Sequence, residues 1–239
     1  MAAPVEDLAK KYGLESIPES VKRLGQLVAK PEATTEEVAK LIGQDKDLIA
    51  RLLRIANPRA ESEDDYGCTT VEEALQRTGM GSVLLVAMHD PLLRAVQKTF
   101  RTMLGVDLAM HKASALAFEG EHLRCEIGFS GRAIGAASLR LTPPTSVEIA
   151  ARVLQMPAAE LNDPLVIDDV IGELSNMVVG NFKSNLCDAG LKCKLSPPVL
   201  TRTEDFELQK PDGALAVRIG FHAPDLDLFV DLHVNPWGE

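Results

Sequence analysis

The chain has 239 residues, of which 46% are hydrophobic and 25% charged, and its formal net charge is −10. This composition is typical of a globular protein long enough for one large or two small domains. An acidic surface without a basic cluster repels phosphate groups, so nucleic acid and anionic membranes are excluded as expected partners.

The amino terminus carries Glu6, Asp7, Lys10 and Lys11 and lacks a hydrophobic signal core. The sequence also contains no apolar run of about 18 residues, the length that a membrane-spanning helix needs. We therefore expect a cytoplasmic protein.

The cysteines and histidines show none of the spacings that bind metals. No two cysteines form a Cys-x-x-Cys pair, and no histidine lies at zinc-ligand spacing from them. We expect free thiols, no metal site, no bound cofactor, and structural roles for His111, His122, His222 and His233.

Residues 14–88 contain the start signals of several short helices. Thr34 with Glu37 and Thr70 with Glu73 have the spacing of a capping box, and Asp45 can cap a further helix. These signals predict a small all-α bundle as a first domain, residues 1–88.

Residues 89–239 alternate between helical and strand-like patterns and are expected to form a second domain, in which Asp90 caps the first helix. Helices are predicted over residues 91–104, 147–154 and 164–189, and strands over residues 122–129, 133–141, 215–221 and 226–234. The fold class predicted for this domain is α+β, with long helices on one face of a mostly antiparallel sheet.

The long helix predicted over residues 164–189 carries a polar stripe. At about 100° per residue, Asn176 lies about 60° to one side of Glu173, opposite a broad apolar face. The stripe points away from the core and contains Asp169, Glu173, Asn176, Gly180 and Lys183.

The same helix is rich in residues that weaken helices. Asn176, Gly180, Asn181 and Asn185 each cost about 0.5 to 1 kcal/mol relative to alanine, so a property other than helix propensity selected them. An isolated Glu-x-x-Asn pair can nevertheless be an ordinary solvated pair on a surface helix.

The pattern Asp169-x-x-x-Glu173-x-x-Asn176, followed by Pro197-Pro198, resembles the signature of the CheX/CheC family of chemotaxis phosphatases. The resemblance covers residues 90–235 approximately. An earlier stretch, Asp90-x-x-x-Arg94-x-x-Gln97, echoes the pattern with the acid and the amide replaced. A single intact site is more similar to CheX than to the two-site CheC type.

The first part of the chain resembles a different family. Residues 36–57, with the helix predicted after Thr70, are similar to the opening of an HDOD domain, a helical signalling module. The resemblance covers only the front of such a domain. It implies a partial HDOD-like domain ahead of the CheX-like one.

The CheX resemblance implies a substrate, a phosphoaspartate on the receiver domain of a response regulator, with Mg²⁺ bound by that partner. Asn176 would hold a water in line with the phosphorus, and Glu173 would pair with a lysine of the receiver. Asp169, Gly180 and Lys183 would contact the partner, Gly180 by allowing close backbone approach.

Two other functions remain open. The chain can be a non-catalytic signalling or scaffold module that binds a receiver domain or another partner without hydrolysis. It can also form a homodimer if residues 226–234 are an edge strand that pairs with a second copy.

Overall fold

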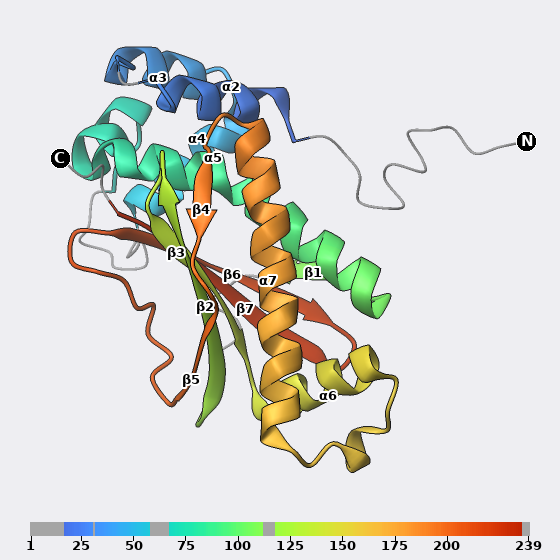
Figure 1. The fold of residues 1–239 in the computed structure, drawn as a ribbon. Coiled ribbons are helices and arrows are strands. Elements are labelled where there is room, and N and C mark those ends of the chain that lie inside the picture. Colours follow the sequence, from blue (N-terminus) through green and yellow to red (C-terminus); the bar gives the residue numbers. More distant parts are fainter. Residues whose placement is uncertain (1–16, 31, 58–66, 112–117, 236–239) are drawn as a thin grey trace, which may run out of the picture.

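The computed structural model describes residues 17–30, 32–57, 67–111 and 118–235 (Figure 1). The helices are α2 Glu19–Val28, α3 Thr35–Ile42, α4 Lys46–Ala56, α5 Val71–Leu104, α6 Pro143–Leu154 and α7 Pro164–Asp188, with a 3₁₀ turn η2 at Ala158–Glu160. The strands are β1 Ala109–His111, β2 His122–Gly131, β3 Gly135–Leu141, β4 Cys193–Leu195, β5 Val199–Thr203, β6 Leu215–Ala223 and β7 Leu226–Val234.

The predicted caps start three of the helices. Thr34 and Thr70 each form a complete capping box, at the starts of α3 and α5. The carboxylate of Asp45 accepts hydrogen bonds from the backbone N–H groups of residues 47 and 48 at 2.9 and 3.2 Å, which starts α4. Local side-chain chemistry therefore sets these boundaries.

Helix α5 is longer than predicted. Gly79 interrupts it with a left-handed φ of 65°, and the helix then continues through residue 90 to Leu104. The expected start of a helix at Asp90 is therefore wrong, because the chain is already helical there. Asp90 is 6% exposed and forms an ion pair with Arg51 of α4 at 2.9 Å instead of capping.

The middle of α5 is buried on every side. Each residue from 81 to 88 is buried, because α2, α3 and α4 pack on one side of this segment and α7, β6 and β7 pack on the other. A helix that is apolar all round needs such complete cover. Residue 88, where we placed the boundary between two domains, lies inside this helix.

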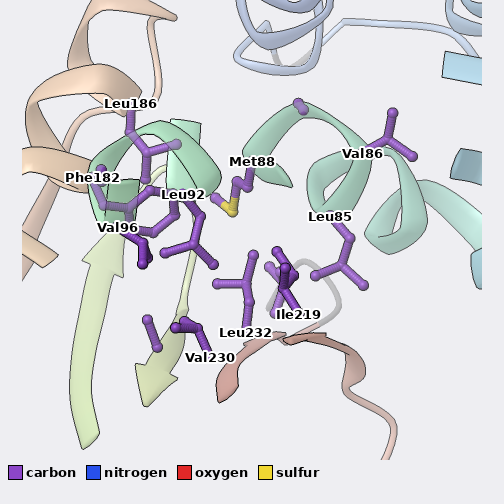
Figure 2. Close-up of a cluster of buried hydrophobic side chains, with 14 of the residues drawn as sticks. Leu85, Val86, Met88, Leu92, Val96, Phe182, Leu186, Ile219, Val230 and Leu232 are labelled. Carbon is purple, nitrogen blue, oxygen red and sulfur yellow. The ribbon is translucent and has the colours of Figure 1, made fainter. Parts of the chain in front are cut away.

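One hydrophobic core runs from the bundle to the sheet. Figure 2 shows Leu85 and Leu92 of α5 directed toward Ile219 of β6 and Leu232 of β7, with Phe182 of α7 beside Leu92. Helix α5 thus connects the two parts of the chain through shared packing.

The sheet has the strand order β1-β6-β7-β3-β2-β4, with β5 also paired to β2, and all pairs among the described strands are antiparallel. Helices α5, α6 and α7 cover one face (Figure 1). The predicted α+β class and the small helical bundle are confirmed. None of the helices in the described ranges is long and apolar enough to cross a membrane.

The expectation that residues 226–234 form an edge strand, through which the chain could pair with a second copy, is wrong. Strand β7 is internal, because it pairs with β6 on one side and β3 on the other along its length. Asp231, for example, lies between Arg218 and Ser138. Both backbone edges of β7 are used within the chain, so no row of free N–H and C=O groups is left for a second copy.

The other face of the sheet carries a buried charge network. Asp231 accepts hydrogen bonds from Arg140 at 2.7 Å and from Arg218 at 2.6 Å, and Arg140 also donates to the backbone oxygens of residues 205 and 207. These bonds fix the segment between β5 and β6 over the sheet. Arg140 Nη1 lies 2.7 Å from His122 Nε2, and since arginine only donates, this nitrogen accepts and the imidazole is neutral.

The bundle also contacts the end of α7. The backbone of Gly25 in α2 lies against Ala189, so that a Cβ at position 25 would be 2.7 Å from the Ala189 carbonyl oxygen. Arg132 Nη1 donates to the Ala29 oxygen at 2.7 Å beside this contact. Close helix approach here depends on the missing side chain of Gly25.

We predict that Gly25→Ala lowers the free energy of unfolding by about 1 to 2 kcal/mol, because the new methyl group overpacks a backbone contact. Gly180→Ala is the matched control. A Cβ there meets nothing within 4 Å, so we expect a gain of about 0.5 to 1 kcal/mol from helix propensity. Urea unfolding measures both, and equal shifts in the two variants would contradict the close packing of α2 on α7.

The buried histidine predicts a pH dependence of stability. Burial lowers the pKa of His122 from its usual 6.5, and the nearby Arg140 lowers it further. The unfolded chain then binds a proton that the folded chain rejects, so stability is full above about pH 6.5 and falls at lower pH. We expect His122→Gln, which still accepts from Arg140, to reduce this fall in urea unfolding between pH 8 and pH 5. An unchanged pH slope would show that His122 does not contribute.

Candidate functional site

Helix α7 begins where the sequence predicted. The Asp163 carboxylate accepts a hydrogen bond from the backbone N–H of Leu165 at 2.9 Å, and Pro164 occupies the first turn, where its missing N–H costs nothing. The helix ends one residue before the predicted Ala189. Its apolar face packs on α5 and on β2 and β3.

The polar stripe faces away from this packing. Asp169, Glu173 and Asn176 are exposed, and Gly180 and Lys183 are half-buried. Within the described part of the chain, Glu173 and Asn176 have no hydrogen-bond or ion-pair partner. The acid and the amide are one helical turn apart on the same surface, so both can contact another molecule at once.

The neighbouring asparagines have partners. Asn181 Nδ2 donates to Thr99 Oγ1 at 3.0 Å, and Asn185 Nδ2 donates to the Pro91 carbonyl oxygen at 2.9 Å, both across the contact with α5. These bonds explain two of the four poor helix formers that the sequence places here. Asn176 is not explained by any contact among the described residues.

Gly180 is also unexplained by packing within the chain. A methyl group added there would meet no heavy atom of the described residues within 4 Å, so their packing does not require a glycine at that position. A glycine on an exposed helix surface leaves room for the backbone of a partner.

Two adjacent acids of α7, Asp168 and Asp169, differ in whether their carboxylates have a partner. Asp168 forms a two-point ion pair with Arg202 of β5, at 2.7 and 3.0 Å, and the hydrogen bonds raise the pKa of that guanidinium. Asp169 faces solvent without a partner in the described ranges. The first of these two carboxylates therefore joins α7 to β5, and the second is available.

The earlier echo of the motif is used inside the chain. Burial raises the pKa of Asp90, but the contact with His89 and the ion pair with Arg51 outweigh burial and leave it lowered, so this carboxylate is an ion. Gln97 Nε2 donates to the Leu108 oxygen at 3.0 Å, which connects α5 to the segment before β1. Within the described residues, Asp90 and Gln97 therefore have polar partners, unlike Asp169 and Asn176, which occupy the same positions in the motif on α7.

A pocket that sequence reasoning missed lies beside Glu173. It has a volume of about 250 Å³ and is lined by Met103 of α5, Val153 of α6, and Asp169, Val170, Glu173, Leu174 and Met177 of α7. Its walls come from three helices, of which α5 is distant in the sequence from α6 and α7, so no local pattern could indicate it. The described residues contain no group of three histidine, cysteine, aspartate or glutamate side chains that could hold a metal ion.

The chain matches two family models. A model for the HDOD domain matches residues 14–136, and a model for the chemotaxis phosphatase CheX matches residues 124–222. The chain belongs to the HDOD family, and its second part is similar to CheX. The HDOD match extends beyond residue 88, through α5 and into β2 and β3, so it covers more than the expected amino-terminal part.

Solved CheX structures have the same fold. CheX from Vibrio vulnificus is 20% identical with a TM-score of 0.54, covering 62% of this chain and 96% of that one. CheX from Desulfovibrio desulfuricans is 17% identical with a TM-score of 0.54, covering 62% and 99%. A CheX–CheY–BeF₃–Mg²⁺ complex from Borrelia burgdorferi is 21% identical with a TM-score of 0.53, covering 62% and 98%. No curated protein matches the chain.

The three asparagines of α7 give a prediction about stability. We expect Asn181→Ala and Asn185→Ala to lower the free energy of unfolding by about 0.5 to 1.5 kcal/mol, because each removes a part-buried hydrogen bond to α5. Asn176→Ala should raise it by about 0.5 kcal/mol, since alanine is the better helix former. Urea unfolding of the three variants tests this order, and a loss of stability in Asn176→Ala would assign that residue a structural role.

Proposed function

We propose that this protein dephosphorylates phosphoaspartate on the receiver domain of a response regulator, with Glu173 and Asn176 as the working pair. The observation that carries the proposal is the contrast within α7. Asn181 and Asn185 are hydrogen-bonded to α5, whereas Asn176 is exposed and has no partner among the described residues.

The chemistry needs little from this chain. In a phosphoaspartate, a water oxygen attacks phosphorus while the bond from phosphorus to the aspartate oxygen breaks, giving phosphate and a free carboxylate. Mg²⁺ on the receiver neutralises the phosphoryl oxygens, so acceleration depends on positioning and charge. The Asn176 amide can accept a hydrogen bond from the water and donate one to a phosphoryl oxygen.

Glu173 has a different part in the proposal. A carboxylate one turn from the amide can pair with a lysine near the phosphoaspartate and set how far α7 inserts. Asp169 and Lys183 extend the same stripe toward the partner, and the open space at Gly180 lets the helix come close. This chain would bind no cofactor, because the metal belongs to the receiver.

The CheX match supports the same function. The matched model is that of a chemotaxis phosphatase, and the Borrelia burgdorferi structure contains CheX together with CheY, BeF₃ and Mg²⁺. That complex is a property of the Borrelia protein. At 21% identity it supports a receiver domain as the partner class for this chain, and the particular receiver is a matter for experiment.

A non-catalytic module is the second candidate, and the bundle favours it. Helix α2, which lies in the region matched by the HDOD model, packs against Ala189 at the end of α7. The helix that carries the candidate site is therefore also in contact with the bundle. A scaffold that holds a receiver domain near another protein would use the same exposed stripe without hydrolysis.

The decisive measurement is the loss of acyl phosphate from purified receiver domains that have been phosphorylated with a small-molecule phosphodonor in the presence of Mg²⁺. We expect the full chain to speed this loss for its cognate receiver and Asn176→Ala to lose about 10²-fold in rate while remaining folded. Glu173→Gln should also reduce the rate, since it removes the charge that pairs with the receiver's lysine.

Asn162→Ala is the matched control, because it removes an exposed amide just before α7 and outside the stripe. It should leave the rate unchanged. Full activity in Asn176→Ala would end the assignment of that residue. Saturable binding by the wild-type chain without faster loss of phosphate would select the non-catalytic module.

A further inference from the structure

The pocket beside Glu173 combines an apolar interior with an acidic rim. Its five apolar lining residues come from α5, α6 and α7, and its two polar lining residues are both carboxylates. The apolar lining consists of Met103, Val153, Val170, Leu174 and Met177. The carboxylates are those of Asp169 and Glu173, which also belong to the exposed stripe.

The geometry of α7 places Glu173 between the amide and the pocket. With Glu173 as the reference, Asn176 lies about 60° to one side, while Met177 and Val170 lie about 40° and 60° to the other. A partner as large as a receiver domain that contacts Asn176 and Glu173 together therefore also extends over the mouth of the pocket.

The surface around the pocket is unusually apolar. Eight large hydrophobic residues are exposed in the described ranges, and five of them lie at the end of α5, in the α6–η2 segment or at the start of α7. The remaining three are Met110, Ile134 and Val199. The five are Met103, Leu154, Met156, Leu165 and Val166, with exposures of 40%, 38%, 43%, 72% and 38%. Figure 1 shows that the end of α5, α6 and the first half of α7 meet at one corner of the molecule. Gathered apolar surface of this kind marks sites of protein contact.

We infer that this pocket receives an aliphatic side chain of the receiver domain, next to a lysine or arginine of that domain that pairs with Asp169. The inference rests on the proposed function, because it takes the receiver as the partner. A volume of about 250 Å³ accommodates a leucine, isoleucine or methionine side chain, since a cavity of about 150 Å³ already holds a benzene molecule.

The acidic rim gives the charge that the partner must carry. Two carboxylates beside an apolar opening repel an acidic or phosphorylated surface and favour a cation at its edge. The pocket therefore selects a receiver by an aliphatic residue with a basic neighbour, beside the groups that reach the phosphoaspartate. It contributes to recognition, and Asn176 contributes to the reaction.

The test measures binding and catalysis separately. The probe for binding is a receiver domain treated with BeF₃⁻ and Mg²⁺, and catalysis is followed as loss of phosphate from the phosphorylated receiver. We expect Met103→Gln to raise Kd and KM about tenfold, because the pocket loses an apolar wall, so that the loss in kcat/KM lies in KM. Asn176→Ala should show the opposite pattern, with a loss in kcat.

Ile134→Gln is the matched control, since Ile134 is equally exposed, at 45% against 40% for Met103, but lies in the turn between β2 and β3. It should change neither constant. Val153→Phe, which fills the pocket, should weaken binding as Met103→Gln does. Asp169→Asn should make Kd less sensitive to salt, because one of the two rim charges is removed.

The outcomes separate this inference from the proposed function. Unchanged Kd and KM in both Met103→Gln and Val153→Phe, with kcat lost in Asn176→Ala, would overturn the pocket and leave the phosphatase intact. Weaker binding in both pocket variants, with no acceleration by the wild-type chain, would support the docking pocket and overturn the phosphatase. Circular dichroism of each variant checks that the fold is retained.

Discussion

The rotation of α7 about its own axis is the constraint on which the candidate site depends. Phe182 and Leu186 are buried in the shared core, and the amides of Asn181 and Asn185 donate across to α5. Side chains and hydrogen bonds of this kind allow one rotation of the helix, because turning it by one residue moves every side chain by about 100°. The exposed position of Asn176 follows from contacts made by the residues that come after it.

The carboxylates of the described residues include some that pair with arginine and others that have no partner. Asp90, Asp168 and Asp231 each pair with arginine, and the carboxylates of Asp90 and Asp231 are buried. In the described ranges Asp169 and Glu173 have no such partner. An unpaired carboxylate in solvent contributes little to the fold, so its presence beside an unpaired amide and an apolar pocket is better explained by contact with another molecule.

Much of the fold could be predicted because its signals are local. Capping boxes start α3 and α5, the apolar period places α7 to within one residue, and the strand over residues 226–234 has the predicted bounds. The same helical period predicted that the polar stripe of α7 faces away from the core. Features that depend on distant residues were missed. Whether β7 is an edge strand is decided by β3 and β6, and the pocket exists only where Met103, Val153 and Met177 come together.

The prediction that a helix starts at Asp90 was wrong because it, too, depended on distant residues. A short polar residue before a proline is a common helix start, and the burial of Asp90 against Arg51 cannot be seen without the position of α4. The uninterrupted apolar run from 83 to 88 was the available sign, since an all-round apolar helix is covered on all sides.

That buried segment belongs to the region matched by the HDOD model, yet it packs on β6 and β7 of the CheX-like sheet. Leu85 and Met88 must therefore suit two sets of neighbours, the helices of the bundle and the strands of the sheet. Replacing either half alone would break this fit, so a substitution on one side of the helix constrains the residues on the other side. In an alignment of proteins with this architecture, substitutions in the helix should covary with substitutions in both strands.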